Sequence, residues 1–488
     1  MFARAYVPDR SGDIFLVPKE GEFLLAADAD SSFYHFMHGS PWSYDVRIPL
    51  LFHGAPFIQK GIYSKSATLQ DIAPTLLTVL DSSVPETMTG HVLVEAIGST
   101  SNKPGVVALL VLDGFGANTW ARYESQLPNL SRLKSEGAWF SNAELNYLPS
   151  VTSTGHATAS TGADPRVHGI QGNATFDREA RKKVEPFENM DPKDFFVPTL
   201  ADFWNLETEG RAVIIAQGGN PRATIALAGH GACEIPGVRA RGAKIIVAQF
   251  DDKTTGWKTN PSCYRLPDSI ADQKANSHWE TTTWLGHSFH DGKTFLRTGL
   301  FARFQMDALL DMIGEEKVGR DSIPDLLLIN LKTPDYVAHQ YGPDSKEMED
   351  AVQAVDEEVG RLTAALEDTA LAGLHGAVLV ITADHGMPKC AAPCERAHYT
   401  PDVATVINKH FGADSLAAYI DESGLQIYVD ETKLPKGKDL SDVARFAEKN
   451  LPFILFAFTK EEIRAAKRGE RRFGIGFAPG SAGMPRDP

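Results

Sequence analysis

The chain has 488 residues, of which 43% are hydrophobic, so it can bury a large core spread over two or three domains. Its 48 lysines and arginines stand against 63 aspartates and glutamates, which gives a net charge of −15. This balance argues against a general nucleic-acid or anionic-membrane surface, because such partners require clustered basic residues. An anionic substrate would therefore need local cations, and metal ions can supply them.

The sequence contains no apolar run as long as the roughly 18 residues that a membrane-spanning helix needs, so no such helix is predicted. Residues 1–10 (MFARAYVPDR) lack the apolar stretch of a secretory signal, so either the chain works in the cytoplasm or the sequence is incomplete. Four cysteines in a chain of this length do not predict a disulfide scaffold. Cys390 and Cys394 (CAAPC) can pair, bind a metal weakly or stay free thiols.

The first 96 residues predict a small set of elements that ends in a breaker-rich segment. Two strands are predicted at residues 13–17 and 48–52, and a helix at 69–80 because its apolar residues recur at helical spacing. Residues 97–105 are small, polar and rich in breakers, and we interpret them as a linker.

Residues 106–400 predict an α/β domain. A continuous apolar run at 106–112 ends in Asp113-Gly114-Phe115-Gly116, as expected of a strand buried on both faces. Similar runs separated by helical stretches predict a doubly wound, mainly parallel sheet flanked by helices. The further predicted strands are residues 211–216, 223–228, 326–331 and 377–382.

The helix after Pro343 is the clearest prediction of the second half. Asp344 and Glu347 fit a capping pair, and the apolar residues that follow recur every three or four positions on one face. From residue 401 to residue 488 the pattern changes to a small α+β cap. Its predicted elements are a helix at 403–410, a strand at 425–429, a helix at 439–450, a strand at 453–459 and a helix at 460–469.

Residues 148–173 (LPSVTSTGHATASTGADPRVHGIQGN) are the first candidate for chemistry, because Thr152 precedes a run of small residues that can start a helix. A threonine at a helix N-terminus meets free backbone N–H groups and the positive end of the helix dipole, which favour its alkoxide form. Such a place can hold phosphate. The other interpretation of Thr152 is an ordinary N-capping residue, since threonine is common there.

Carboxylates and histidines follow three of the predicted strands. Asp113 ends the first, Asp384 and His385 end the last, and Asp335 and His339 lie four residues apart, so one helical face can present both to a metal. Mixed carboxylate and imidazole ligands suit zinc, and two ions about 4 Å apart suit displacement at phosphorus. Asp335 and His339 provide only two ligands for one ion, so a third is missing from the second half of the chain.

Four segments resemble the alkaline phosphatase superfamily, in particular the branch of threonine-nucleophile alkaline phosphatases and type I phosphodiesterases or nucleotide pyrophosphatases. They are VVALLVLDGFG, PSVTSTGHATASTGADPRVHGIQGN, PDLLLINLKTPDYVAHQYGPDSKEMEDAVQAVDEEV and AVLVITADHG. In that family a last histidine ligand follows in a His-Gly-Ser/Thr context near the C-terminus. Here the segment that resembles this part of the family is MHGSPWSYDVRIPLLFHG, which puts His38 in the place of the last ligand.

The resemblance therefore implies a circularly permuted chain. Residues 1–96 would be the displaced C-terminal segment of the catalytic domain, residues 106–400 its core, and residues 401–488 a cap that packs with the N-terminal strand. Permutation is physically reasonable because domain termini lie at the surface and often close together. The alternative is that residues 1–96 are the tail of a neighbouring copy, but the chain contains only one His-Gly-Ser.

The resemblance also implies a ligand set and a nucleophile. One zinc ion, or another divalent metal, would be held by Asp335, His339 and His38, and a second by Asp113, Asp384, His385 and Thr152. Thr152 would attack phosphorus and form a phosphothreonine. Asn173 and the backbone N–H of Ser153 would hold a phosphoryl oxygen.

One segment departs from the family pattern. The alkaline phosphatases of this branch carry Lys-x-Arg, and the aligned residues here are Asn220-Pro221-Arg222, so Arg222 keeps one cation and Asn220 replaces the other. The preference for monoesters should then be weaker. In the other interpretation Arg222 is a surface arginine and the alignment has slipped. His156, His168 and His230 are interpreted as structural or supporting residues.

We therefore expect a metal-dependent hydrolase of small phosphate esters, with monoesters favoured because Arg222 is retained. The alternatives are a phosphodiesterase or nucleotide pyrophosphatase, a phosphonate hydrolase, and a non-catalytic binding protein that kept the fold. A sulfatase is not expected, because no Cys or Ser stands in the C/S-x-P-x-R setting of a formylglycine. Family relatives are typically periplasmic or secreted. The oligomeric state and the natural substrate do not follow from the sequence.

Overall fold

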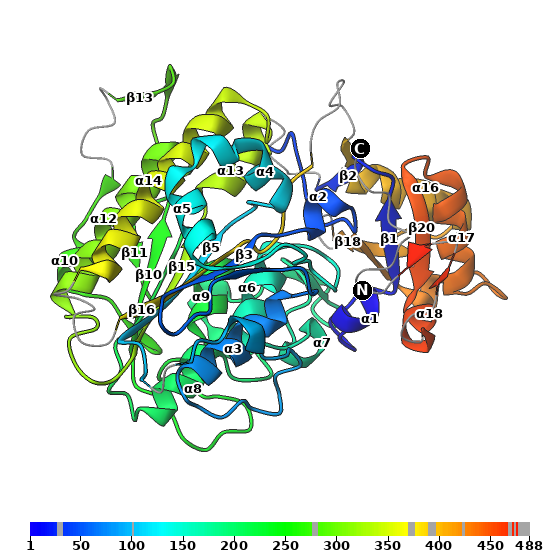
Figure 1. The fold of residues 1–488 in the computed structure, drawn as a ribbon. Helices are drawn as coiled ribbons and strands as arrows, with labels where there is room; N and C mark the ends of the chain where they lie inside the picture. The colour runs from blue at the N-terminus through cyan, green and yellow to red at the C-terminus, as the bar shows by residue number, and fades with distance from the viewer. Residues whose placement is uncertain are drawn as a thin grey trace.

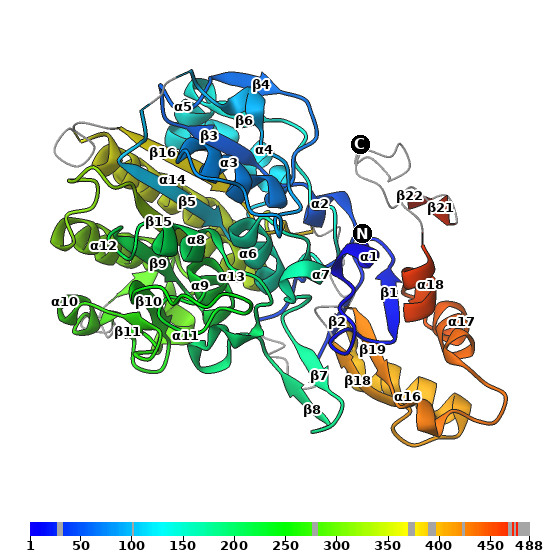
Figure 2. The same ribbon diagram turned by 90° about the horizontal axis from the view of Figure 1, so that it is seen from below.

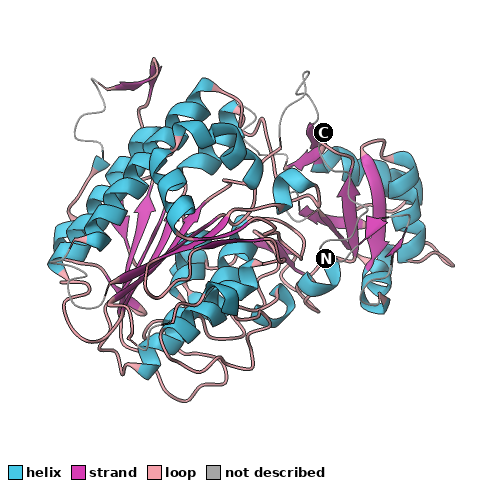
Figure 3. Ribbon diagram, viewed as in Figure 1, coloured by secondary structure: helices cyan, strands magenta, loops and turns pink. Residues whose placement is uncertain are grey.

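A large twisted sheet crosses the molecule, and helices cover both of its faces (Figure 1 and Figure 3). A smaller sheet with its own helices lies to one side, on the right in Figure 1. The structure is a computed structural model. It describes residues 1–26, 33–99, 102–275, 282–368, 376–388, 397–421, 425–466, 471–472 and 475–476.

The large sheet has ten strands. In sheet order they are β11 (Gly256–Lys258), β10 (Ile245–Asp251), β9 (Ile214–Gly218), β15 (Asp325–Leu331), β5 (Val106–Leu112), β16 (Ala377–Thr382), β3 (Leu50–His53), β6 (Ala138–Phe140) and β4 (Gly61–Tyr63), with β12 (Tyr264–Arg265) beside β10. Pairing from β10 to β16 is parallel, and β3 is antiparallel to both of its neighbours. Every residue of β5 and β15 is buried, because helices cover both faces. The predicted α/β fold with a mainly parallel sheet is confirmed.

Two sets of helices pack on opposite faces of this sheet (Figure 1 and Figure 2). One set contains α4 (Ala117–Tyr123), α5 (Pro128–Glu136), α12 (Gly299–Glu315), α13 (Thr333–Tyr341) and α14 (Lys346–Glu367). The other contains α3 (Ile72–Val79), α6 (Thr152–Thr161), α8 (Leu200–Glu207) and α9 (Pro221–Ala228). Among the described residues, no helix combines the length and the apolar composition that a membrane crossing requires.

The small sheet combines strands from the two ends of the described chain. Its order is β18 (Ala417–Asp421), β19 (Gln426–Val429), β1 (Ile14–Pro18) and β20 (Ile454–Thr459), accompanied by α16 (Thr400–Phe411), α17 (Leu440–Asn450) and α18 (Lys460–Ala465). Successive side chains of β1 point to opposite faces. Ile14 and Leu16 join the core of the small sheet, whereas Phe15 and Val17 join the core of the large one. The N-terminal strand therefore packs into both hydrophobic cores.

The predicted strand at 223–228 is wrong, because these residues form helix α9. The Asn220 side chain caps that helix by accepting a hydrogen bond from the Ala223 N–H (3.0 Å), and Pro221 occupies the first turn, where its missing N–H costs nothing. A short apolar run cannot be assigned to a strand or a helix by hydrophobicity alone. Asn220 and Pro221 are typical of a helix start, and they distinguish a helix from a strand here.

The helix predicted after Pro343 is confirmed as α14, but its cap differs from the prediction. The Ser345 side chain accepts a hydrogen bond from the Met348 N–H (3.0 Å), whereas Asp344 forms an ion pair with Arg122 (2.9 Å). The elements predicted at 403–410, 425–429, 439–450, 453–459 and 460–469 correspond to α16, β19, α17, β20 and α18. Strands β6, β10 and β18 were not predicted.

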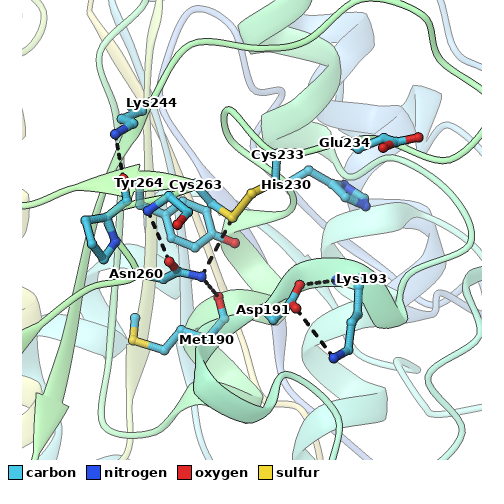
Figure 4. The surroundings of a disulfide bond; sticks show 12 residues. Met190, Asp191, Lys193, His230, Cys233, Glu234, Lys244, Asn260, Cys263 and Tyr264 are labelled. Carbon is cyan, nitrogen blue, oxygen red and sulfur yellow. Dashed lines mark hydrogen bonds and ion pairs between the residues drawn. A yellow bond between two sulfur atoms is a disulfide. The ribbon is translucent and has the colours of Figure 1, made fainter.

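Cys233 and Cys263 form a disulfide that the sequence analysis did not predict (Figure 4). It joins the segment after α9 to the loop before β12, across a sequence separation of 30 residues. The neighbouring Tyr264 hydroxyl donates to the carbonyl oxygen of Gly229, the C-cap residue that follows α9 (2.6 Å). Cys390 and Cys394 lie outside the described residues.

Candidate active site

Three carboxylates gather at the carboxyl edge of the large sheet. Asp113 directly follows β5, and its N–H donates to the Leu331 carbonyl at the end of β15 (3.0 Å). Asp384 follows β16 on the other side of β5 and accepts a hydrogen bond at Oδ1 from the Gly114 N–H (3.0 Å). Asp335 lies in the first turn of α13, just after β15. The ends of three neighbouring strands thus bring the carboxylates together, where ligands bind in open α/β sheets.

Thr152 is the first residue of α6, and it does not act as a cap. Val151 occupies the N-cap position, and no side chain caps the helix, so the interpretation of Thr152 as a capping residue is wrong. The Thr152 side chain is buried, and its Oγ1 lies 3.4 Å from His385 Nε2. Helix α6 approaches the sheet closely because residue 155 is glycine: a Cβ there would lie 2.6 Å from the Asp384 Cβ.

His38 reaches the site from the front of the chain. Its ring stacks on the His385 ring, with centroids 3.5 Å apart and planes at 14°. His38 Nε2 lies 3.7 Å from Asp335 Oδ1, and His339 Nε2 lies 3.3 Å from the same oxygen. The His35 and Phe36 N–H groups both donate to the His339 carbonyl (2.9 and 3.1 Å), which docks this segment on α13. The structure therefore brings together the three residues that sequence reasoning grouped.

We name the two predicted ligand sets the Asp335 group (Asp335, His339 and His38) and the Asp113 group (Asp113, Asp384 and His385). All three histidines place Nδ1 on a backbone carbonyl: His38 on Ser150 (2.9 Å), His339 on Phe36 (2.6 Å) and His385 on Gly386 (3.0 Å). A carbonyl only accepts, so each Nδ1 carries a hydrogen, and Nε2 is the nitrogen that can bind a metal ion once it is unprotonated. Second hydrogen bonds of this kind orient histidines that bind metal.

The charges of the site favour cations. Asp335 Oδ1 and Oδ2 and Asp384 Oδ2 are buried, and their close contacts include Lys332 Nζ (2.6 Å from Asp335 Oδ2), His339 Nε2 (3.3 Å from Asp335 Oδ1) and His385 Nε2 (3.2 Å from Asp384 Oδ2). Burial and the neighbouring Asp384 raise the pKa of Asp113 to about 8. Burial lowers the pKa of His385, yet the carboxylates, Asp384 first, outweigh it and raise that pKa to about 9. These groups fit divalent metal ions, because buried carboxylate oxygens and imidazole nitrogens, the usual oxygen and nitrogen ligands of such ions, converge there.

Two sets of three buried residues each bring their ligand atoms within 4.8 Å of one another. The first set is His38, Asp335 and His385, and the second is Asp113, His156 and Asp384. His385 thus lies between the two predicted groups, where its Nε2 is 3.7 Å from Asp113 Oδ1 and 3.2 Å from Asp384 Oδ2. His156 differs, because its Nε2 accepts a hydrogen bond from Asn330 Nδ2 (2.9 Å), which also donates to Asp113 Oδ2 (2.8 Å). Asn330, which sequence reasoning missed, therefore links His156 to Asp113.

Asn173 adjoins Thr152, in a different arrangement from the one expected. The Ser153 N–H donates to Asn173 Oδ1 (2.9 Å), so this N–H is engaged within the protein and is not free for a phosphoryl oxygen. The bond fixes the amide of Asn173, whose Nδ2 is its hydrogen-bond donor. Asn173 is largely buried beside the start of α6.

Arg222 lies in the first turn of α9 and is partly exposed. Burial lowers its pKa, but the nearby acidic groups Glu185, Tyr336, Tyr34 and Asp335 outweigh that effect and raise the pKa. Asn220 is occupied as the cap of α9.

Lys332 was not singled out from the sequence. Its Nζ lies 2.6 Å from Asp335 Oδ2, 2.8 Å from Asp113 Oδ1 and 3.3 Å from Thr152 Oγ1. The side chain is only 2% exposed. A lysine directly after a buried apolar strand and three residues before Asp335 was the available signal.

Comparison with known proteins places this geometry in a family. The sequence pattern of the type I phosphodiesterase / nucleotide pyrophosphatase family matches residues 107–463, most of the chain. The chain belongs to this family. The matched region contains the Asp113 group, Thr152, Asp335 and His339, and it begins after the segment that carries His38.

Several family relatives are alkaline phosphatases by name. Alkaline phosphatase PafA of Elizabethkingia meningoseptica is 26% identical over 426 residues, covering 74% of this chain and 76% of the relative. Alkaline phosphatase PhoV of Synechococcus elongatus is 26% identical over 59% of this chain and 60% of its own length. Ectonucleotide pyrophosphatase/phosphodiesterase family member 3 of Mus musculus is 25% identical over 62% of this chain, but only 27% of its own length.

The fold also matches a solved member. The crystal structure of wild-type PafA superimposes with a TM-score of 0.63 at 22% identity, covering 76% of this chain and 81% of PafA. The predicted superfamily and the predicted enzyme class, a hydrolase of phosphoric esters, are confirmed. The two buried ligand clusters agree with a metal-dependent member of this family.

Proposed function

We propose that this chain is a two-zinc phosphomonoesterase that acts through a phosphothreonine at Thr152. The observation that carries the proposal is the position of Thr152 Oγ1. It lies at the start of a helix, 3.4 Å from His385 Nε2, where the Asp113 and Asp335 groups meet. The dipole of the helix N-terminus favours negative charge on this oxygen and on a bound phosphate.

The reaction consists of two displacements at phosphorus. In the first, Thr152 Oγ1 loses its proton and bonds to phosphorus while the bond to the leaving oxygen breaks, and the departing alcohol takes up a proton. In the second, a water oxygen bonds to phosphorus while the bond to Thr152 breaks. Thr152 regains its proton, and inorganic phosphate leaves.

The Asp335 group would hold one divalent ion, and the Asp113 group with Thr152 Oγ1 would hold the other. Bound zinc would supply Lewis acidity and offset charge on the phosphoryl and leaving oxygens. Asn330 orients Asp113 through its 2.8 Å hydrogen bond, and His156 in turn contacts Asn330 (2.9 Å). Asn173 Nδ2 would donate to a phosphoryl oxygen.

The preference for monoesters is supported by Arg222. A monoester carries one more negative charge at phosphorus than a diester, and a charged hydrogen bond to it is worth about 1.5–3 kcal/mol. Turnover of p-nitrophenyl phosphate and of bis(p-nitrophenyl) phosphate by the zinc-loaded protein tests this preference. We expect the larger kcat/KM for the monoester. A large preference for the diester would support the phosphodiesterase or nucleotide pyrophosphatase alternative that the mouse relative represents.

Metal analysis separates an enzyme from a non-catalytic relative of the same fold. We expect two equivalents of zinc per chain in the purified protein. Acid quenching during turnover should leave phosphate on the peptide that contains Thr152. Less than one equivalent, with no turnover after zinc is added, would instead indicate a binding protein.

We further propose that the chain is circularly permuted, with residues 1–96 as the displaced C-terminal segment of the catalytic domain. Support comes from β1, which inserts between β19 and β20, and from β3, which inserts between β16 and β6. Arg464 Nη2 of α18 also donates to the Tyr6 hydroxyl (2.5 Å). A variant that carries residues 1–96 after residue 488, through a short linker, should keep the fold, the zinc content and turnover. If the segment instead serves a neighbouring copy, mixed His38→Ala and His385→Ala proteins should recover activity that neither has alone.

A further inference from the structure

Lys332 is a buried ammonium at the meeting point of the two ligand groups and the proposed nucleophile. It contacts one carboxylate of each group, Asp335 at 2.6 Å and Asp113 at 2.8 Å, and it donates to Thr152 Oγ1 at 3.3 Å. Its Nζ also lies 5.0 Å from the centre of the Tyr336 ring. Burying an ammonium is costly unless charged partners compensate. The carboxylates of Asp113 and Asp335 provide this compensation for Lys332.

The fold makes room for this side chain. A Cβ at Gly219 would lie 2.9 Å from Lys332 Cβ and 3.2 Å from Lys332 Cγ, so a larger residue at position 219 would collide with its stem. Gly219 directly precedes Asn220, the residue that stands where the family's Lys-x-Arg pattern has lysine. The loop at Gly219 and Asn220, which lacks the expected lysine, therefore packs against Lys332, which follows β15.

At Asp335, Lys332 contacts a different oxygen from the one that two histidines face, whereas at Asp113 it shares Oδ1 with His385 Nε2 (2.8 and 3.7 Å). Asp335 presents Oδ2 to Lys332, while His38 Nε2 and His339 Nε2 lie 3.7 and 3.3 Å from Oδ1. Asp335 Oδ1 therefore stays available to a metal ion when Lys332 is in place.

We propose that Lys332 is the second phosphoryl-binding cation of the site and takes over the role of the lysine that Asn220 replaces. This inference rests on the proposed function, because it assumes that Thr152 attacks phosphorus. In a near-attack geometry phosphorus lies about 3–3.5 Å from the attacking oxygen. Lys332 Nζ, 3.3 Å from that same oxygen, can then contact an oxygen of the phosphoryl group. Together with Arg222 it would match the two charges of a monoester.

A purely structural role would give a different result. If Lys332 only neutralised Asp113 and Asp335, its removal would disturb the carboxylates, and both ester types would lose turnover together with metal. As a phosphoryl-binding cation it instead discriminates between substrates by charge. The contact with Thr152 Oγ1, which a mere neutraliser of the two carboxylates would not need, favours this second role.

The test compares zinc-loaded wild type with Lys332→Met, which keeps the length but not the charge, and with Lys332→Arg, which keeps the charge. Inorganic phosphate is the probe, measured by isothermal titration calorimetry, and zinc content is measured on the same samples. We expect Lys332→Met to bind phosphate about tenfold more weakly or worse, with wild-type zinc content. Lys332→Arg should recover part of this affinity.

Turnover gives the second measurement. The ratio of monoester to diester kcat/KM should fall by about tenfold in Lys332→Met, because the diester has less charge to bind. Unchanged phosphate affinity, or equal losses for both esters accompanied by loss of zinc, would overturn the assignment. If wild type turns over neither ester, the proposed function fails, and the phosphate titration still decides whether Lys332 binds the anion.

Discussion

The two ligand groups of the site are held in different ways. The Asp113 group follows directly from β5 and β16, two adjacent parallel strands, and backbone hydrogen bonds such as Gly114 N–H to Asp384 Oδ1 (3.0 Å) fix it. The Asp335 group combines a helix with His38, which lies outside any helix or strand. The docking of His35 and Phe36 on the His339 carbonyl, and of Ser150 on the Ser40 carbonyl (2.9 Å), holds this segment. One group is positioned by the sheet, and the other by long-range contacts.

The largest effect should come from the residue at which the two groups meet. Thr152→Ala removes the nucleophile, so turnover of p-nitrophenyl phosphate should fall on the order of 10⁴-fold or more, as for other nucleophile deletions. Zinc content should stay at the wild-type level, because both groups keep their other ligands. Thr152→Ser is the matched control and should retain substantial turnover. Unchanged turnover in Thr152→Ala would refute the nucleophile assignment.

Removal of one histidine from each ligand group should have different effects on zinc binding. His38→Ala should lose about one equivalent of zinc and keep the ion of the Asp113 group, while turnover falls on the order of 100-fold or more. His385→Ala should weaken both ions, because His385 lies beside Asp113, Asp384 and the His38 ring. Zinc analysis of both proteins checks this difference.

His35→Ala is the control for the His38 variant, because His35 belongs to the same segment but points its ring nitrogen at the Gln340 carbonyl (2.8 Å) and is exposed. Its zinc content should be close to that of wild type. A His38→Ala protein that still holds two equivalents of zinc would show that His38 is not a ligand. The Asp335 group would then need another third member.

Arg222→Gln should change the preference between ester substrates and leave both ligand groups intact. Loss of one charged hydrogen bond, worth about 1.5–3 kcal/mol, should lower kcat/KM for the monoester by roughly 10- to 100-fold. The diester should lose much less, and zinc content should not change. Equal losses for both esters would mean that Arg222 acts through the position of α9 and not through contact with substrate.

How much the sequence predicts differs between the two groups for the same physical reason. Asp113, Asp384 and His385 follow apolar runs, and the rule that ligands gather at the carboxyl ends of parallel strands brings them together without further information. His38 follows no such run, and only the resemblance to a family suggested its place. The disulfide between Cys233 and Cys263 lacked even that signal.

Lys332 and Asn330 were missed because a polar residue at a strand end is usually exposed. Their burial depends on packing from α6 and from the Gly219 loop, which no local pattern reveals. For helix α9, in contrast, a local signal was present and the prediction was still wrong. Its alanine-rich run resembled a strand, and the meaning of the preceding Asn220 and Pro221 as a helix start was available but not used.

The smallest effect on turnover should come from the disulfide, which lies beyond the C-terminal end of α9, whereas Arg222 lies at the start of that helix. Cys233→Ser removes a cross-link between residues 30 positions apart in the sequence, which restricts the unfolded chain. The free energy of unfolding should therefore fall by about 2–4 kcal/mol. Eight helical residues span about 12 Å, which separates the bond from the guanidinium. Turnover and zinc content of the folded variant should therefore match those of wild type, while denaturant unfolding shifts to lower concentration. If turnover falls together with stability, the disulfide is needed to position α9 and therefore Arg222. Arg222 would then be held by a long-range contact, as His38 is.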